Sequence, residues 1–167
     1  MKKMTEESLH ASLAGESQAH VKYAAFAEQA EKEGKPNVAR LFRAASYAEQ
    51  VHATVHLRTL GGIGASADNL TAAAGGENFE IDEMYPAYIA VAQLQGEKGA
   101  ERSMYRALET EKVHAMLYKA AHEALTNGQD ASAQPLWVCP VCGFTMEGEP
   151  PDKCPLCNTP KNKFQKF

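Results

Sequence analysis

The fold is decided by two short stretches of sequence, Glu49-Gln50-Val51-His52 at residues 49–52 and Glu111-Lys112-Val113-His114 at residues 111–114. In each, a carboxylate and an imidazole stand three residues apart. Residues at this spacing lie on one face of an α-helix, so both side chains can reach the same point. Each motif also follows another glutamate by nearly the same interval, 33 residues from Glu16 to Glu49 and 34 residues from Glu77 to Glu111. This repeat predicts four helices that direct acidic side chains toward a shared centre.

Capping signals bound four long helical segments ahead of residue 129. The first is predicted from Thr5, as the N-cap residue, to Gly34, and the second from Pro36 to residues 61–62. Proline suits the first turn of a helix, and glycine suits the position just after its end. The third segment is predicted from about residue 68 to 95, with Pro86 as a kink inside it, and the fourth from about residue 97 to 125.

The four glutamates fall on the apolar stripes of these helices. A lone glutamate on a helix is usually solvated, and a single Glu-x-x-His motif is weak support for a metal. Several buried carboxylates without cations, however, would each be costly and would repel one another. A glutamate on two helices with Glu-x-x-His on the other two is the ligand set of ferritin-like di-iron bundles. Oxygen-rich ligands suit iron or manganese better than a closed zinc site, and the sequence leaves that choice open.

The four cysteines form two knuckles, Cys139-Pro140-Val141-Cys142 and Cys154-Pro155-Leu156-Cys157, with eleven residues between them. This spacing predicts one tetrahedral metal site with Cys139, Cys142, Cys154 and Cys157 as ligands, in preference to disulfides. A segment of about thirty residues needs the metal for its own stability. Trp137, Phe144 and Phe164 are the candidates for its small core. Spacing alone favours zinc slightly, whereas a neighbouring redox site that needs electrons favours iron.

The chain is therefore predicted to be mainly α. A ferritin-like four-helix bundle is expected over residues 1–128, a polar linker over 129–135, and a rubredoxin-like four-cysteine domain over 136–167. The net charge of −4 and the lack of a Lys/Arg cluster argue against nucleic acid or an anionic membrane as a partner. No apolar run is long enough to span a membrane. Residues 1–7 lack the apolar run of a secretory signal, so a cytoplasmic protein is expected.

Taken together, the two halves resemble the rubrerythrins over nearly the whole chain. The matching stretches are Gly15-Glu16, both Glu-x-x-His motifs, residues 76–80 (Gly-Glu-Asn-Phe-Glu), residues 84–86 (Met-Tyr-Pro), and Trp137-Val138-Cys139 with the knuckles. The second glutamate of residues 76–80, Glu80, is specific, because simple ferritin-like proteins have no need of it. Phe79 and Asn158 depart from residues that are common in the family, but neither change removes a ligand.

The resemblance implies a ligand set for the oxidised iron pair: Glu16, Glu49, Glu77, Glu80, Glu111 and His114, with Glu49 and Glu111 bridging. It further implies that one iron exchanges Glu80 for His52 on reduction, and that Tyr23 and Tyr85 hydrogen-bond near the site. A charge count supports the exchange independently. Two ferric ions carry six positive charges against the five glutamates, whereas two ferrous ions carry four, and a buried excess of negative charge is expensive.

The activity implied is a peroxidase that reduces hydrogen peroxide to water, in defence against oxidative stress. Electrons would come from an NAD(P)H-dependent reductase or a rubredoxin through the thiolate-bound iron, and the family is usually dimeric, so a homodimer is expected. Two alternatives remain at this point. One is a ferroxidase or oxidase that uses dioxygen, and the other is a metal-binding adaptor whose cysteine domain is a zinc ribbon.

Overall fold

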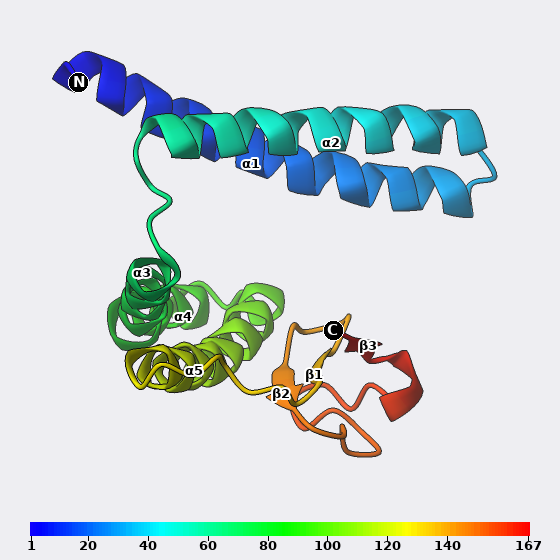
Figure 1. The fold of residues 1–167 in the computed structure, drawn as a ribbon. Coiled ribbons are helices and arrows are strands. Elements are labelled where there is room, and N and C mark those ends of the chain that lie inside the picture. Colours follow the sequence, from blue (N-terminus) through cyan, green and yellow to red (C-terminus); the bar gives the residue numbers. More distant parts are fainter. The chain divides into compact units, whose positions relative to one another are not determined.

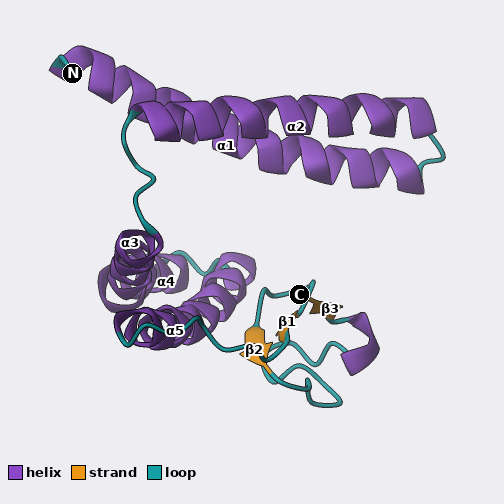
Figure 2. Ribbon diagram, viewed as in Figure 1, coloured by secondary structure: helices purple, strands orange, loops and turns teal.

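The computed structural model describes residues 1–167, and most of the chain is helical (Figure 1, Figure 2). It divides into two compact units, Met1–Gly64 and Ala65–Phe167. The first unit contains helices only. The second contains further helices and a small three-stranded sheet, and all four cysteines lie in the loops between its strands. The predicted fold class, mainly α with a small cysteine domain at the C-terminal end, is confirmed.

The first unit is a helical hairpin of α1 (Lys3–Lys32) and α2 (Pro36–Thr59). The turn between them needs Gly34, whose φ of 68° is the left-handed conformation that glycine adopts without strain. Pro36 stands in the first turn of α2, as predicted. Small buried residues on both helices (Ala27, Ala30, Ala39, Ser46, Ala53) allow the two backbones to approach closely.

The start of α1 differs from the prediction. The helix begins at Lys3, and the preceding Lys2 is its N-cap residue although it makes no side-chain cap. Thr5 lies inside the first turn, where its backbone N–H donates to the Lys2 carbonyl at 3.0 Å. Backbone bonds to Lys2 therefore extend the helix two residues past the residue with the better capping side chain. Helix ends exposed to solvent are weakly specified by capping residues alone.

In the second unit, one long helical rod contains α3 (Ser66–Phe79), a π-helical turn (Glu80–Met84) and α4 (Tyr85–Leu94), and it packs against α5 (Lys98–Thr126). The π turn lies directly before Pro86, where a kink was predicted. Pro86 has no N–H to continue the α-helical ladder, and the N–H of Tyr85 donates to the Glu80 carbonyl, five residues back. The proline is thus accommodated by a widened turn.

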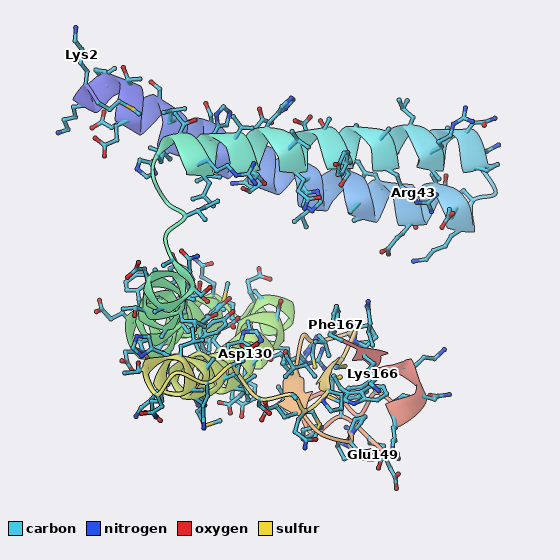
Figure 3. The ribbon with its side chains drawn as sticks, in the orientation of Figure 1. Lys2, Arg43, Asp130, Glu149, Lys166 and Phe167 are labelled. Atoms are coloured by element: carbon cyan, nitrogen blue, oxygen red, sulfur yellow. The ribbon has the colours of Figure 1, made fainter.

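The cysteine domain contains β1 (Leu136–Val138), β2 (Thr145–Glu147) and β3 (Gln165–Lys166), antiparallel in the order β2-β1-β3, with a 3-10 turn at Lys161–Lys163. Its core is Cys139, Cys154 and Phe164, with Trp137 and Phe144 packed against it. The three aromatic residues predicted for this core are therefore confirmed. The Lys166 ammonium lies 5.8 Å from the centre of the Trp137 ring. Figure 3 shows Lys166 beside Phe167 at the C-terminal end of this domain.

Residues 129–135 form no helix or strand, which motivates a prediction about the linker. A chain that ends at Gly128 is expected to remain helical and to bind about two irons, as a complete di-iron ligand set would. Circular dichroism and metal analysis of the truncated protein check this. A disordered or metal-free product would contradict the proposed boundary between bundle and cysteine domain.

Candidate metal centres

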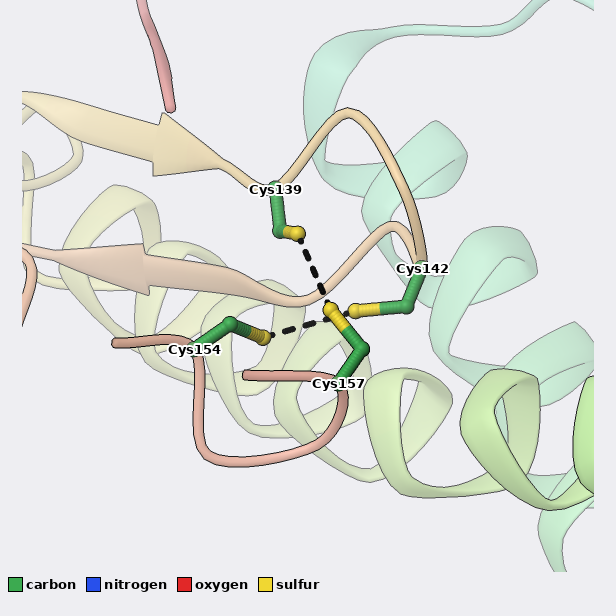
Figure 4. Close-up of side chains that lie close together, drawn as sticks. All are labelled: Cys139, Cys142, Cys154 and Cys157. Atoms are coloured by element: carbon green, nitrogen blue, oxygen red, sulfur yellow. Dashed lines mark hydrogen bonds between the residues drawn. The ribbon is translucent and has the colours of Figure 1, made fainter. Parts of the chain in front are cut away.

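The four cysteine thiols converge on one point (Figure 4). The Sγ atoms of Cys139 and Cys157 are 3.5 Å apart, as are those of Cys142 and Cys154. A disulfide needs about 2.05 Å, and all four thiols are free. A tetrahedral ion with metal–sulfur bonds of about 2.3 Å separates its sulfurs by about 3.8 Å. The observed spacing therefore fits a four-thiolate metal site and excludes the disulfide alternative.

The thiols differ in acidity because their surroundings differ. Burial raises the pKa of Cys157, but hydrogen bonds from the Thr159 side chain and backbone, with those from Cys142 and Cys139, outweigh it and lower the pKa to about 6. Burial raises the pKa of Cys142 and that of Cys154. Four neighbouring thiols cannot all ionise without a cation. A metal ion must displace the remaining protons, so binding at this site releases protons.

The first unit holds one cluster of three predicted ligands, Glu16 on α1 with Glu49 and His52 on α2. The Nδ1 atom of His52 lies 3.0 Å from Glu49 Oε2 and 4.0 Å from Glu16 Oε1. The His52 side chain is 56% exposed within this structure. Nearby, the Ser46 hydroxyl lies 2.9 Å from Nδ1 of His20 and donates to the His20 carbonyl, so His20 ties the two helices together.

The second unit holds the matching cluster, Glu77 on α3 with Glu111 and His114 on α5. Here Nδ1 of His114 lies 2.7 Å from Glu111 Oε2 and 3.7 Å from Glu77 Oε1. Burial raises the pKa of Glu77, and the neighbouring Glu111 charge raises it further. Carboxylate oxygens and an imidazole nitrogen that crowd together in this way form a donor set for a cation. The cluster fits iron or manganese ligation.

Glu80 and Tyr85 lie near this second cluster, and the roles that the resemblance implies for them stay predictions. Burial raises the pKa of Glu80, and the charge of Glu77 adds to it. Burial also raises the pKa of Tyr85, with further contributions from Glu80 and Glu111. Glu80 is outside the group of three whose ligand atoms lie within 4.8 Å of one another. Tyr23, in the other unit, packs against Phe26 and Phe42, and its predicted role near the metals stays a prediction.

Tyr118 is a residue of this region that the sequence did not single out. Its ring centre is 6.3 Å from that of His114. Burial raises its pKa, as do the charges of Glu77 and Glu111. The signal was present in the sequence, because Tyr118 follows His114 by four residues and shares its helix face.

The cysteine domain touches the second cluster directly. Nε2 of His114 lies 2.9 Å from the hydroxyl oxygen of Thr145, the first residue of β2. That hydroxyl in turn donates to the carbonyl of Gly143 at 2.9 Å. Gly143 is bonded to the metal-ligand candidate Cys142. Two hydrogen bonds and one peptide bond thus connect His114, a predicted bundle ligand, to Cys142, a predicted thiolate ligand, within one compact unit.

Comparisons with known proteins agree on both parts of the chain. The family model described as Rubrerythrin matches residues 7–122, and that described as Rubrerythrin, rubredoxin-like domain, matches residues 137–165. Rubrerythrin-2 of Clostridium acetobutylicum is 40% identical, over 98% of this chain and 97% of its own. Nigerythrin of Nitratidesulfovibrio vulgaris is 36% identical, over 98% and 86%. The solved structure of fully reduced, all-ferrous nigerythrin is 34% identical over 98% and 86% of the two chains, with a TM-score of 0.58.

None of the helices has the length and apolar character that a membrane crossing requires.

Proposed function

Because the chain belongs to the rubrerythrin family, we propose that it is a peroxidase that reduces hydrogen peroxide to water, with electrons entering through the cysteine domain. The observation that carries the proposal is the His114–Thr145 contact, which brings the four-cysteine site against a Glu/His cluster of the di-iron type. A thiolate site that carries electrons would serve a redox reaction at this position if the neighbouring cluster of Glu77, Glu111 and His114 accepts those electrons.

The residues that would hold the iron pair come from both units: Glu16, Glu49 and His52 from the first, and Glu77, Glu80, Glu111 and His114 from the second. Neither helical pair alone supplies a ferritin-like set. Each pair also leaves large apolar side chains exposed, such as Phe26 and Val51 in the first unit and Phe79 and Val91 in the second. Helices with such faces need a second layer. The proposal therefore includes a four-helix bundle built from both kinds of pair, in a homodimeric protein.

An iron pair, when bound, supplies the two electrons that reduce the oxygen–oxygen bond of peroxide. The chain's own part is to position ligands and hydrogen-bond donors around it. Phenols are protonated at neutral pH, and the raised pKa values of Tyr85 and Tyr118 favour that form further, so each can donate a hydrogen bond toward the carboxylates. Partial burial of Glu77 and Glu80 strengthens such bonds.

The electron donor in this proposal is an NAD(P)H-dependent reductase or a rubredoxin, acting in the cytoplasm. Such a donor must reach the cysteine site from solvent. The knuckle residue Val141, next to Cys142, is 61% exposed and offers that approach.

The proposal is tested by supplying a reductase and NAD(P)H to the iron-loaded protein under anaerobic conditions and measuring peroxide consumption. Peroxide-dependent oxidation of NAD(P)H is expected, with dioxygen a much poorer oxidant. Glu77→Ala should lower turnover by more than about 100-fold, because loss of even an outer partner of a metal ligand costs 10–100-fold. Turnover that requires dioxygen would replace the proposal with an oxidase or ferroxidase. A zinc-filled cysteine site without turnover would replace it with an adaptor function.

A further inference from the structure

We propose that Thr145 is a positioning residue for the bundle metal site: its hydroxyl fixes the His114 imidazole in the tautomer that leaves Nδ1 free to bind metal. The inference deepens the proposed function and rests on its assignment of His114 as a ligand. Thr145 belongs to the cysteine domain, so the ligand geometry of the helical part would depend on a side chain from the neighbouring domain.

The hydrogen bonds of the Thr145 hydroxyl determine which nitrogen of His114 carries a proton. A threonine hydroxyl has one proton to donate and two lone pairs that can accept. Its proton is used in the 2.9 Å bond to the Gly143 carbonyl, which can only accept. The oxygen, 2.9 Å from Nε2 of His114, is therefore the acceptor there, and Nε2 must carry a proton.

The other ring nitrogen, Nδ1, faces the two carboxylates of the cluster. A neutral imidazole with a proton on Nε2 has its lone pair on Nδ1. Nδ1 faces Glu111 Oε2 at 2.7 Å and Glu77 Oε1 at 3.7 Å, both of which are acceptors when ionised. Three electron-pair donors directed at one another repel unless a positive charge lies between them, either a proton or a metal ion that displaces it. The hydrogen bond at one side of the ring thus prepares the other side for metal, which is how partners of metal-binding histidines generally act.

The support behind Thr145 is rigid. Thr145 is buried and pairs with Val138 across the β1–β2 ladder. The Gly143 carbonyl accepts the hydrogen bond of the Thr145 hydroxyl. Gly143 has a φ of 80°, and its N–H donates to the Cys139 carbonyl at 2.9 Å. A Cβ at Gly143 would also meet the Thr110 methyl of α5 at 4.0 Å. The loop that orients the hydroxyl is therefore the Cys139–Cys142 knuckle, whose conformation depends on its own metal.

The test compares Thr145→Val, which keeps the shape and removes the hydroxyl, with Thr145→Ser, which keeps the hydroxyl. Thr110→Val is the matched control: Thr110 is buried one turn before His114, but its hydroxyl donates to the Arg106 carbonyl of its own helix. The full chain, with iron in the cysteine site, is titrated with Mn²⁺ and the free ion is followed by electron paramagnetic resonance. Thermal melts confirm that each variant folds, and Thr145→Ala replaces the valine variant if it does not.

Thr145→Val is expected to lower Mn²⁺ affinity about 10–100-fold, the usual effect of losing such a partner, whereas the serine and Thr110 variants should stay close to the parent protein. In the zinc-loaded protein, nitrogen-15 NMR should show a slowly exchanging Nε2–H on His114 that the valine variant loses. Equal affinity in Thr145→Val and the parent, or an equal loss in Thr110→Val, would overturn the inference. Because neither readout uses peroxide, an inactive protein that retains this affinity pattern would refute the peroxidase proposal and leave the role of Thr145 standing.

Discussion

Cys142→Ser is expected to abolish the visible absorption of a ferric thiolate site and to lower reductase-driven peroxide reduction by more than about 100-fold, well beyond the cost of an outer-partner loss. The Cys142 sulfur is 3.5 Å from that of Cys154, and its removal leaves three thiols for a tetrahedral ion. Since the core of this domain consists of its own metal ligands with a few aromatic residues, residues 136–167 should also loosen. Visible spectroscopy and the coupled peroxidase assay measure both effects.

The control for this variant lies next to it. Val141→Ser alters an exposed side chain of the same knuckle that is not a ligand, and it should leave the visible spectrum unchanged. The helical part should still melt cooperatively in Cys142→Ser, because no bundle ligand comes from the knuckle. Unchanged visible absorption would contradict the assignment of the cysteines as iron ligands.

Glu80→Ala and His52→Ala are expected to have opposite effects on the two oxidation states of the bundle site. Glu80→Ala should still load ferrous iron but retain ferric iron poorly, whereas His52→Ala should destabilise the ferrous pair. The reason is charge: a carboxylate balances a ferric ion, and a neutral imidazole balances a ferrous one without a buried excess of negative charge. Burial, and then the charge of Glu77, raise the pKa of Glu80, so without a metal ion the anionic form of Glu80 is disfavoured there.

Iron retention after gel filtration, measured for reduced and oxidised protein, separates the two variants. Glu83→Ala, an exposed change in the same π turn, and His56→Ala, one helical turn beyond His52, serve as controls and should bind iron in both states. Crystal structures of both oxidation states in which Glu80 stays bound and His52 unbound would refute the exchange and leave a fixed di-iron site.

Most of the fold could be predicted from the sequence because its signals are local. Gly34 and Pro36 set one helix boundary through backbone preferences that hold in almost any context. The resemblance to rubrerythrins, drawn from short motifs, is confirmed by family matches over both parts of the chain. The cysteine spacing identified a four-ligand site because two knuckles leave little choice of geometry.

Other features depend on packing between distant segments and left no local signal. Thr145 and His114 are 31 residues apart, and nothing in either sequence neighbourhood indicates that they meet. The sequence predicts a kink at Pro86, because proline interrupts the helical hydrogen bonds. It does not indicate that the helix accommodates the interruption by a π turn. Tyr118 had the right spacing, but a tyrosine on an apolar stripe is ordinary core until its neighbours are known to be Glu77 and Glu111.

The π turn determines the direction, around the helix axis, in which the side chains of α4 point relative to those of α3. Tyr85 comes eight residues after Glu77, and at about 100° per residue an unbroken α-helix would leave it about 80° away from that carboxylate's face. The wide turn at Glu80–Met84 accommodates one extra residue, so Tyr85 occupies the position that a seventh residue would have, about 20° from Glu77. This agrees with the charges of Glu77, Glu80 and Glu111 all acting on the Tyr85 phenol. The helical repeat therefore differs between the π turn and the α-helical parts of the rod. A comparison of relatives that assumes a single α-helical repeat would place Tyr85 on the wrong face of the helix.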